Sequence, residues 1–551
     1  MIKSLSVTVL PKDEKNESLI RSLISKEIKK SGLSYKKMTP VFEKKSIDAR
    51  HGQVKLHLKF TVYLDQDAPA SNAAENGMEW KKADGKHSVL IIGAGPAGLF
   101  GALKLLEKGI KPIILERGAE TSQRKKDIAL ISTQNLVNED SNYCFGEGGA
   151  GTFSDGKLYT RSNKRGNIQE ILQTFVYFGA DPKILTDAHP HIGTDRLPQV
   201  INNMRKKILE CGGEIYFNTR CTDLILEGKT VKGVKAVSVL PAEGVESARG
   251  VMTAGGAGAA GRDFFADAVL LATGHSAPDI YNIIARRAPQ CLEAKTFAAG
   301  VRVEHPRELI DKIQFHGRGA DAALLGAAEY RLTTQVDERG VYSFCMCPGG
   351  FVVPSSSGPE EIVVNGMSAA KRNSKWSNAA IVVEIRPEDI PAEYKKQADD
   401  AGCPALAGLF FRSAIEYAAK QNGKGQAAPS QKLTDFLENK KSTSLPASSY
   451  TPGLVSSNLN EWLPPHISKR LKKAFPLFNN MMHGYVCEEA LMIAIETRTS
   501  TPVRICRDSE SLESTQLKNL YPAGEGSGYA GGIVSSAMDG QNCCKKIMQN
   551  F

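Results

Sequence analysis

The stretch that decides the fold is residues 88–118, SVLIIGAGPAGLFGALKLLEKGIKPIILERG. Residues 88–92 are an apolar run typical of a buried parallel strand, and a glycine-rich turn at 93–98 follows it. Helical spacing of apolar residues continues through 99–108, and 111–115 form a second apolar run. The stretch therefore predicts one complete βαβ unit.

The glycines of this turn have the G-x-G-x-x-G spacing of dinucleotide-binding proteins. Gly93 permits the tight turn, Gly95 lets the backbone approach a pyrophosphate, and Gly98 lets helix and strand pack closely. The helix start presents unpaired N–H groups and a positive dipole to phosphates. Glu116 follows Gly98 by 18 residues, where an acidic side chain accepts hydrogen bonds from ribose hydroxyls. We expect a dinucleotide site here; an ordinary βαβ unit is the alternative.

The composition is that of a globular chain. With 551 residues, of which 41% are hydrophobic, about two to four domains are expected. The longest uncharged apolar stretch, 88–103, is shorter than the ~20 residues that a membrane-spanning helix needs, so no membrane partner is expected. Eleven cysteines without C-x-x-C or paired metal spacing predict a reducing, cytoplasmic setting, without disulfides or a metal site.

The N-terminal residues 1–65 predict a small α+β domain. Alternating apolar residues predict strands at 3–10 and 54–64, and 38–47 are expected to form a third. Asn16 is placed to cap the helix between the first two strands.

Basic charge is concentrated in this domain. Of the net charge of +10, +8 lies in residues 1–60. Such a surface suits nucleic acid or another acidic partner. The favoured interpretation is that the lysines only solvate exposed faces, because no aromatic residues alternate along one sheet face for base stacking. Residues 66–86 are small and polar, and predict a linker.

The glycine pattern alone identifies no site, because it occurs again from Gly146, Gly256 and Gly526. The second of these lies in a Gly/Ala tract before an apolar strand predicted at 264–271. We therefore expect a flexible loop at 241–263 rather than a second nicotinamide-binding domain. Residues 151–157 nearly spell a P-loop, but Leu158 replaces the Ser/Thr that holds magnesium, which excludes an NTPase.

Two later segments accompany the first site. Residues 265–273 predict an apolar strand whose ending, the triplet ATG at 272–274, would bring backbone close to a bound cofactor. A strand leaving into glycines at 520–526 is followed by a helix that starts at 531–533. A dinucleotide with both a pyrophosphate and a reducible ring would use both helix starts. This favours a flavin over a nicotinamide as the tightly held cofactor.

Six further stretches carry a family resemblance: GEGGAGTFSDGKL (146–158), HPHIGTDRL (189–197), FAAGVRVEHP (297–306), YSFCMCPGGFVVPSSS (342–357), VVNGMS (363–368) and ETRTSTPVRI (496–505). With the motifs above, nearly the whole chain resembles the bacterial FAD-dependent proteins called NAD(FAD)-utilising dehydrogenases, which have the glutathione-reductase-type flavoprotein fold.

The resemblance implies an α/β fold with a discontinuous Rossmann-like FAD-binding domain, an inserted mixed-sheet substrate domain and the small N-terminal α+β domain. The implied boundaries are 1–65 for the basic domain, 66–86 for the linker, 87–160, 210–290 and 485–551 for the FAD-binding domain, and 161–209 and 291–484 for the substrate domain.

The resemblance also implies which residues hold FAD. Residues 146–152 would wrap the pyrophosphate and ribityl chain, with Lys157 near the isoalloxazine ring. Arg117 and Arg124 are expected at the adenosine and phosphates, although a solvated surface position is the alternative for Arg124. The expected FAD-binding set is Gly93, Gly95, Pro96, Ala97, Gly98, Glu116, Arg117, Arg124, Gly146, Gly148, Gly149, Gly151, Thr152, Lys157, Thr273, Gly274, Gly524, Glu525, Gly531, Gly532 and Ile533.

The candidates for chemistry beyond the flavin are Cys347 and Lys157. Cys345 and Cys347 form a C-x-C pair, and residues two apart in a strand share a side, so both sulfurs would point into one cavity. Packing in a core is the alternative for both cysteines. The Lys157 ammonium would stabilise a reduced flavin anion, whereas a surface lysine is its alternative.

Two other charged groups invite functional interpretations. His189, His191 and Asp195 fit no strong metal-ligand motif, and we expect their loop to cap the helix that follows. Glu496 and Arg498 predict a charged pair before a strand, where either a ring contact or a domain-interface ion pair is open.

These features predict an FAD-dependent oxidoreductase that transfers hydride through flavin N5 to or from an unidentified small-molecule substrate. NADH or NADPH is a candidate transient electron donor. The alternatives are an RNA-linked flavoprotein that uses the basic N-terminal domain and a redox-sensing flavoprotein that turns nothing over.

Overall fold

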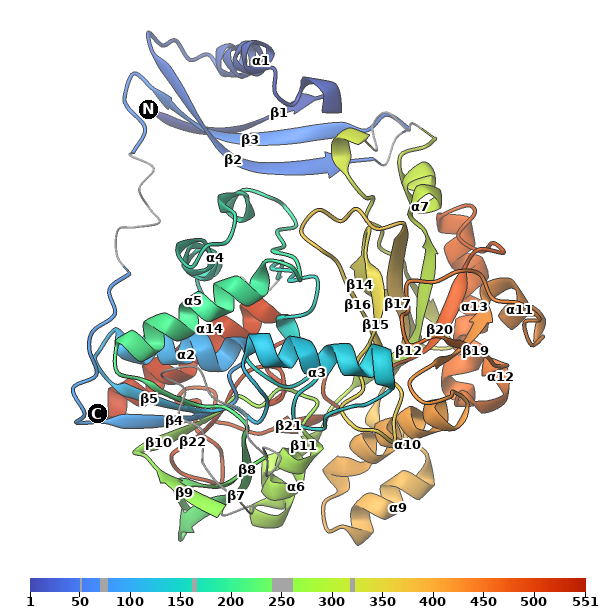
Figure 1. The fold of residues 1–551 in the computed structure, drawn as a ribbon. Coiled ribbons are helices and arrows are strands. Elements are labelled where there is room, and N and C mark those ends of the chain that lie inside the picture. The colour runs from blue at the N-terminus through green and yellow to red at the C-terminus, as the bar shows by residue number, and fades with distance from the viewer. Residues whose placement is uncertain (50–51, 70–77, 161–165, 240–260, 318–322) are drawn as a thin grey trace.

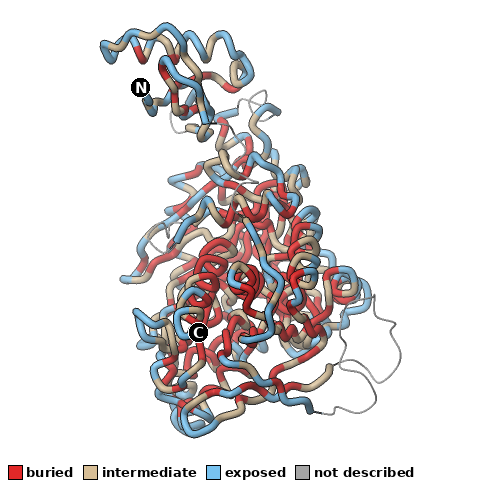
Figure 2. The backbone as a smooth tube through the Cα atoms, turned by 90° about the vertical axis from the view of Figure 1, so that its left-hand side faces the viewer, coloured by how far each residue is buried: buried red, intermediate tan, exposed pale blue. Residues whose placement is uncertain are grey.

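The computed structural model describes residues 1–551 apart from 50–51, 70–77, 161–165, 240–260 and 318–322 (Figure 1). Most of the loop expected at 241–263 and part of the linker expected at 66–86 lie outside the described residues. A small N-terminal unit sits at one end of a larger body, in which buried segments dominate (Figure 2).

The N-terminal unit is a three-stranded antiparallel sheet with one helix. Strands β1 (Ile2–Val9), β2 (Met38–Asp48) and β3 (Lys55–Leu64) take the order β1-β3-β2, and α1 is Glu17–Lys30. Every second residue of β3, from Leu56 to Leu64, is buried in a core shared with Ile24 and Ile28 of α1. The Asn16 side chain accepts a hydrogen bond from the N–H of Leu19, which confirms the predicted cap.

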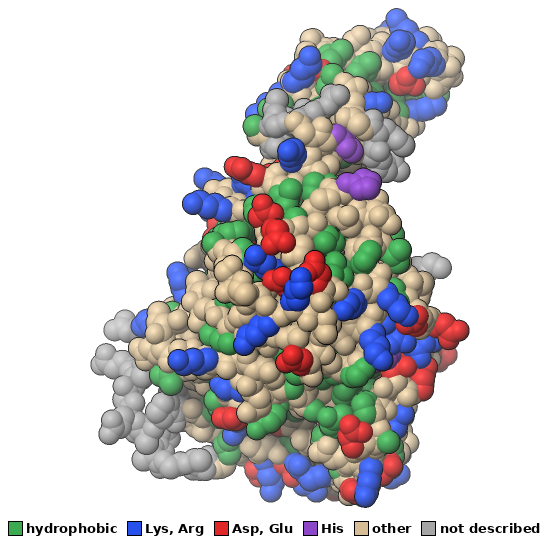
Figure 3. Space-filling model, turned by 90° about the vertical axis from the view of Figure 1, so that its right-hand side faces the viewer, with side chains coloured by type: hydrophobic (Ala, Val, Ile, Leu, Met, Phe, Trp, Pro, Cys, Tyr) green, Lys and Arg blue, Asp and Glu red, His purple; other side chains and the backbone are tan. Residues whose placement is uncertain are grey.

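Backbone pairing joins this unit to the body. Lys45 on β2 donates its N–H to the carbonyl oxygen of Thr186 at 3.1 Å and accepts from the N–H of Ala188 at 3.1 Å. Farther along, Nε2 of His316 lies 2.6 Å from the carbonyl oxygen of Ala49. Lys and Arg side chains stand out on the unit, whereas both signs of charge are mixed on the visible face of the body (Figure 3).

The body is organised around a five-stranded parallel sheet of order β22-β10-β4-β5-β6. Its strands are β4 (Ser88–Ile92), β5 (Lys111–Leu115), β6 (Glu214–Tyr216), β10 (Ala268–Leu271) and β22 (Leu520–Pro522), with helices α2 (Pro96–Leu106) and α14 (Ile533–Ile547) following β4 and β22. The βαβ unit is confirmed residue for residue at both strands. Tertiary pairing of β10 with both β4 and β22 brings distant segments of the chain into one sheet.

Helices α2 and α14 cross at close range because glycines face each other. A Cβ on Gly540 would overlap the carbonyl oxygen of Ala97, and one on Gly101 would lie 3.1 Å from the sulfur of Cys544. The missing side chains let the two helices approach closely. Both helices lie against the same face of the parallel sheet, with their N-termini close together (Figure 1).

The single apolar strand expected at 264–271 is wrong. Residues Gly261–Phe265 form β9 of a three-stranded antiparallel sheet with β7 (Thr219–Glu227) and β8 (Thr230–Ser238), and β10 begins only at Ala268. The strand breaks at Asp267, whose carboxylate accepts a hydrogen bond from the N–H of Ser88 at 2.9 Å. Apolar character alone does not show where one strand ends and another begins.

A seven-stranded mixed sheet forms the second half of the body, in the order β13-β14-β17-β12-β20-β18-β19. Its strands are β12 (Phe297–Pro306), β13 (Thr333–Val336), β14 (Arg339–Cys347), β17 (Trp376–Ile385), β18 (Ala428–Lys432), β19 (Leu454–Ser456) and β20 (Leu491–Glu496). The central strand β12 is buried along nearly its whole length because both of its faces are covered.

The remaining elements complete the described part of the body. The short strands are β11 (Leu292–Ala294) paired with β21 (Val503–Ile505), and β15 (Phe351–Pro354) paired with β16 (Val364–Met367). The remaining helices are α3 (Thr121–Gln134), α4 (Ile168–Tyr177), α5 (Leu197–Glu210), α6 (Pro278–Arg287), α7 (Arg307–Gln314), α9 (Ala392–Asp400), α10 (Ala407–Gln421), α11 (Leu433–Glu438), α12 (Leu459–Trp462) and α13 (Pro465–Met481). Over the described ranges, none of the helices combines the length and the apolar character that crossing a bilayer requires.

Candidate functional site

A cavity of about 360 Å³ opens at the carboxyl ends of the parallel strands, where ligands bind in open α/β sheets. Segments from four strand ends line it, together with β14 and the loop after β20. From the expected set, the lining includes Gly93, Gly95, Pro96, Ala97, Glu116, Arg117, Gly149, Gly151, Lys157, Thr273, Gly274, Gly524, Glu525, Gly531, Gly532 and Ile533.

Two helix N-termini meet at this cavity. Gly95 caps α2 and Gly532 caps α14, so neither capping residue has a side chain to occupy the first N–H groups of its helix. A Cβ on Gly274, Gly531 or Gly532 would have no heavy atom of the described chain within 4 Å. The glycines thus leave space for a ligand at both helix starts. The positive end of each helix dipole favours a negatively charged group there.

Glu116 holds the turn around which the cavity is built. One carboxylate oxygen accepts from the N–H of Ala94 at 2.8 Å, and the other accepts from the N–H groups of Gly118 and Gly146 at 2.9 Å each. The side chain is nearly buried yet borders the cavity. Since a carboxylate has about four lone-pair positions, one remains for a ribose hydroxyl. That contact stays a prediction.

Arg117 and Arg124 have different surroundings. Arg117 borders the cavity, pairs with Asp140 at 3.0 Å and lies over the ring of Phe145. Arg124 is fully buried and lies outside the cavity lining. Its guanidinium nitrogens donate to backbone carbonyls of residues 142–149, so the solvated surface position given as its alternative is wrong, and its contact with adenosine or phosphate stays a prediction.

Four more members of the expected set shape the loop without lining the cavity. A Cβ on Gly98 would overlap the carbonyl oxygen of Gly93, and one on Gly146 would overlap the Arg124 side chain. Gly148 has φ +78° and lies against the hydroxyl of Thr152, which donates to the carbonyl of Glu147 at 2.9 Å. These residues position the backbone that faces the cavity.

A lysine and two thiols form a cluster at the cavity wall. Nζ of Lys157 lies 3.6 Å from Sγ of Cys345, 3.7 Å from Sγ of Cys347 and 2.9 Å from Oδ2 of Asp155. Cys345 lines the cavity, whereas Cys347 is fully buried behind it. The predicted C-x-C pair is therefore brought to Lys157, but Cys345 replaces Cys347 as the thiol at the wall.

The charge distribution of this cluster favours a thiolate at Cys345. A hydrogen bond from the Cys347 thiol holds the pKa of Cys345 well below its ordinary value, helped by Lys157 and Arg302 and opposed by burial. The pKa of Cys347 is raised, because it donates that hydrogen bond and is buried. Burial would lower the pKa of Lys157, but Cys345, Cys347 and Asp155 together raise it.

Arg302 supports the cluster from behind. It is buried on β12 and pairs through Nε with Oε2 of Glu496 at 2.9 Å. Its Nη1 donates to Oδ1 of Asn378 at 2.7 Å and to the carbonyl oxygen of Cys345 at 3.2 Å. Glu496 therefore pairs with Arg302 instead of with Arg498, which corrects the expected pair.

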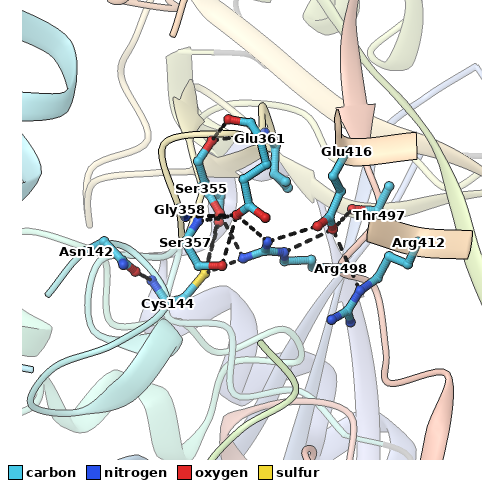
Figure 4. Close-up of polar contacts among 12 residues, drawn as sticks. Asn142, Cys144, Ser355, Ser357, Gly358, Glu361, Arg412, Glu416, Thr497 and Arg498 are labelled. Atoms are coloured by element: carbon cyan, nitrogen blue, oxygen red, sulfur yellow. Dashed lines mark hydrogen bonds and ion pairs between the residues drawn. The ribbon is translucent and has the colours of Figure 1, made fainter. Parts of the chain in front are cut away.

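Arg498 lies between two glutamates at another wall of the cavity (Figure 4). Nη2 contacts Glu416 at 3.1 Å and also pairs with Glu361, while Nη1 lies 3.2 Å from Sγ of Cys144. Burial would raise the pKa of Glu416, but Arg498 and Arg412 outweigh it and lower that pKa to about 2. Arg498 thus forms ion pairs and borders the cavity, and a contact with the flavin ring stays a prediction.

The histidine loop does not cap the following helix, which corrects that prediction. Oδ1 of Asp195 accepts from the N–H of Ala370 at 2.7 Å, and α5 begins without a side-chain cap. Nδ1 of His189 lies 2.8 Å from Oε2 of Glu329, and Nε2 of His191 lies 3.2 Å from the carbonyl oxygen of Ala370. The described residues hold no cluster of three or more His, Cys, Asp or Glu suited to a metal ion.

Sequence reasoning missed several residues of the site: Asp155, Arg302, Glu361, Arg412 and Glu416. Asp155 and Arg302 carried a local signal, because they lie within the stretches 146–158 and 297–306. Glu361, Arg412 and Glu416 are single charged residues outside those stretches. Only the tertiary fold brings Glu361 and Glu416 to Arg498 at the cavity wall, with Arg412 behind Glu416.

Comparisons with known proteins identify the family. A model of the FAD-dependent protein C-terminal domain matches residues 296–499, one of an FAD-binding domain matches 86–136, and one of a domain of unknown function (DUF8436) matches 1–63. An uncharacterized protein of Clostridium beijerinckii is 39% identical over 467 residues, covering 84% of this chain and 81% of that protein. The chain belongs to the family of this clostridial protein. The matched models make the family FAD-dependent, and FAD is the cofactor of this flavoprotein.

Two other similarities to this flavoprotein are more distant. Thiamine thiazole synthase of Archaeoglobus fulgidus is 40% identical over 63 residues, 11% of this chain and 23% of that protein. The E. coli quinol fumarate reductase subunit FrdA is 11% identical, covering 84% of this chain and 70% of that one with a TM-score of 0.34. Neither similarity carries information about activity.

The residues around the cavity fit FAD. The open space beside Gly274, Gly531 and Gly532 is the cradle that a dinucleotide with two polar ends requires. Oδ1 of Asp155 is buried at the wall and has no hydrogen-bond partner in the described chain. A ligand hydroxyl or N–H would satisfy this oxygen, and FAD carries both.

Proposed function

We propose that the chain is an FAD-dependent oxidoreductase in which hydride passes through flavin N5 beside Lys157. The observation that carries the proposal is the meeting of two glycine-capped helix starts at one cavity, in a chain whose residues 86–136 match the model of an FAD-binding domain. The first start, at Gly95, would hold the pyrophosphate, and the second, at Gly532, would face the flavin ring. We also propose the glutathione-reductase type for the FAD-binding fold.

FAD, when bound, supplies a ring that takes up or releases a hydride. The chain's own residues orient the ring and stabilise its charge. The Lys157 ammonium is held by Asp155 at 2.9 Å, and the N-terminus of α14 adds a positive dipole on the same cavity. Both favour negative charge on a reduced ring.

The electron donor is proposed to react from this same cavity. In the described chain, one sheet of more than two strands is entirely parallel, and it is the sheet that contains β4. The proposed FAD site lies at the carboxyl ends of the strands of that sheet. NADH or NADPH, if it is the donor, would therefore bind transiently beside the flavin instead of in a second dinucleotide-binding domain.

A matched pair of glycine substitutions tests the proposal. Gly95 and Gly261 both have ordinary φ angles, and a Cβ on either meets its nearest neighbour at 3.9 Å. Gly95→Val should weaken FAD binding by more than about tenfold, which is about 1.4 kcal/mol, because its side chain would fill the pyrophosphate site. Gly261→Val, on β9, should bind FAD like the unmodified protein.

The measurement is the visible absorbance of purified protein titrated with FAD, followed by anaerobic addition of NADH and of NADPH. Rapid bleaching by one nucleotide would identify the donor. Full flavin occupancy in Gly95→Val, or no flavin absorbance in the unmodified protein after FAD is added, would contradict the proposal.

A further inference from the structure

The wall of the cavity carries a thiol pair that hydride transfer through FAD does not use. Cys345 borders the cavity, and Cys347 lies directly behind it with no exposed surface. Both sulfurs lie within 3.7 Å of Nζ of Lys157, and Sγ of Cys347 also donates to the carbonyl oxygen of Cys345 at 3.3 Å. Two sulfurs that share one ammonium contact beside a redox cofactor site are placed to act as a pair.

The backbone is bent where this contact is made. The pairing of β14 with β17 shifts register between Phe344 and Cys347, and Cys345 has φ +45°, a conformation that residues other than glycine rarely adopt. A bulge of this kind redirects side chains and is over-represented beside active sites. Cys345, the residue with the strained backbone, is also the one whose side chain borders the cavity.

Cations surround the pair. Lys157 contacts both sulfurs, and Nη1 of Arg302 lies 4.0 Å from Sγ of Cys347. The carboxylates that face the cluster are Asp155 and Glu496, and each is already paired, with Lys157 and with Arg302. A negative sulfur in this setting is stabilised, and a thiolate is the reactive form of cysteine.

We propose that Cys345 and Cys347 form a dithiol–disulfide pair that exchanges two electrons with FAD, so that this flavoprotein stores four electrons in one cavity. The inference rests on the proposed function, because it needs a redox-active FAD beside the pair. It adds a second redox centre, made only from side chains of this chain.

The step balances within the site. In the oxidising direction, the Cys345 thiolate and the Cys347 thiol form one S–S bond. The electron pair and the Cys347 proton pass to oxidised FAD, which becomes the singly charged reduced form. In the reverse direction the S–S bond breaks, Cys345 leaves as the thiolate and Cys347 takes the proton. Lys157 stabilises the negative charge on the sulfur in one state and on the ring in the other.

Electron counting on the holoprotein tests the proposal. The protein is treated with diamide to oxidise accessible thiol pairs, freed of reagent by gel filtration, and titrated anaerobically with dithionite at the flavin absorbance. We expect full reduction to take four electrons per FAD in the unmodified protein and two in Cys347→Ser. Cys221→Ser, which removes another thiol at the same cavity, should still take four.

Mass spectrometry provides a readout that does not depend on the flavin. The tryptic peptide 340–371 contains Cys345 and Cys347 and no other cysteine. After diamide it should be lighter by two hydrogens and resist iodoacetamide until it is reduced. Two electrons per FAD in the unmodified protein, with a peptide alkylated twice after diamide, would overturn the dithiol pair while leaving the FAD site intact. Absence of flavin would instead overturn the proposed function.

Discussion

Single residues show how far a local motif can be trusted. The C-x-C spacing predicts two sulfurs on one side of a strand, and both do reach Lys157. The bulge at Cys345 decides which sulfur borders the cavity, and nothing in the sequence reports that bulge. The same holds for Arg124, whose donors are used by carbonyls of a loop that is close only in the folded chain.

The thiolate at Cys345 has a testable pH dependence. The Cys347 thiol and the cations Lys157 and Arg302 hold the pKa of Cys345 well below its ordinary value, whereas burial raises the pKa of Cys221 to about 12. In protein stripped of FAD, we expect iodoacetamide to modify Cys345 at pH 7 at least about tenfold faster than Cys221, with a rate that rises less steeply from pH 7 to 9 than that of an ordinary thiol. Peptide mass spectrometry measures both rates.

Lys157→Met should slow that reaction at pH 7 and make its rate rise more steeply with pH, because removal of the ammonium raises the pKa of Cys345. Lys157→Arg keeps the charge and serves as the control. Equal rates at Cys345 in all three proteins would show that the lysine does not stabilise the thiolate.

Glu116 should contribute stability as well as a ligand contact. Its carboxylate satisfies three backbone N–H groups in a buried turn, and a buried unsatisfied donor costs about 1–3 kcal/mol. Glu116→Ala should lower the thermal midpoint of protein stripped of FAD by several degrees, and Glu116→Gln, which retains one acceptor oxygen, should lower it less. An unchanged midpoint in Glu116→Ala would contradict this role.

At the scale of elements, the site depends on two helices, α2 and α14, which contact each other through glycines. The sequence predicts the start of α14 at 531–533, and the structure places it at Ile533. The crossing with α2 was not predicted, because glycine inside a helix is a weak local signal that acquires meaning only from the helix opposite. Here Gly101 and Gly540 permit the approach that brings both N-termini to one cavity.

A methyl group at this crossing should separate the helices. Gly540→Ala would overlap the carbonyl oxygen of Ala97, and overpacking of this kind costs about 1–3 kcal/mol. We expect a lower thermal midpoint and weaker FAD binding, since the α2 start moves with the helix. Gly358→Ala, where a Cβ meets open space at an ordinary φ, is the control; FAD affinity in Gly540→Ala equal to that of the control would exclude this coupling.

At the scale of the whole molecule, the N-terminal unit is attached to the body but has a core of its own. Leu56 to Leu64 of β3 pack against α1, while the contacts to the body include the backbone of Lys45 and Ala49 and the side chain of Val54, which is buried in the core of the body. The attachment at Thr186 and Ala188 adjoins His189, which pairs with Glu329. The unit therefore borders the loop that leads toward the cavity without contributing to its lining.

Removal of residues 1–65 should leave FAD binding intact, because none of them lines the cavity. The ratio of flavin to protein in the purified truncated chain measures this directly. A truncated chain that folds, judged by circular dichroism, yet binds no FAD would show that the N-terminal unit helps to form the site. Salt-dependent binding of RNA by the full chain, lost on truncation, would support the RNA-linked alternative.

The sequence by itself determined the βαβ unit, the FAD-type cofactor and the second helix start, because strand, turn and helix signals act over a few neighbouring residues. The tertiary structure decided which chemistry-bearing side chains share the cavity. Lys157, Cys345 and Arg498 border it from segments far apart in the chain, and the bulge at Cys345 decides which thiol faces it. Such contacts depend on strand pairing and helix packing across the whole body, which no local pattern encodes.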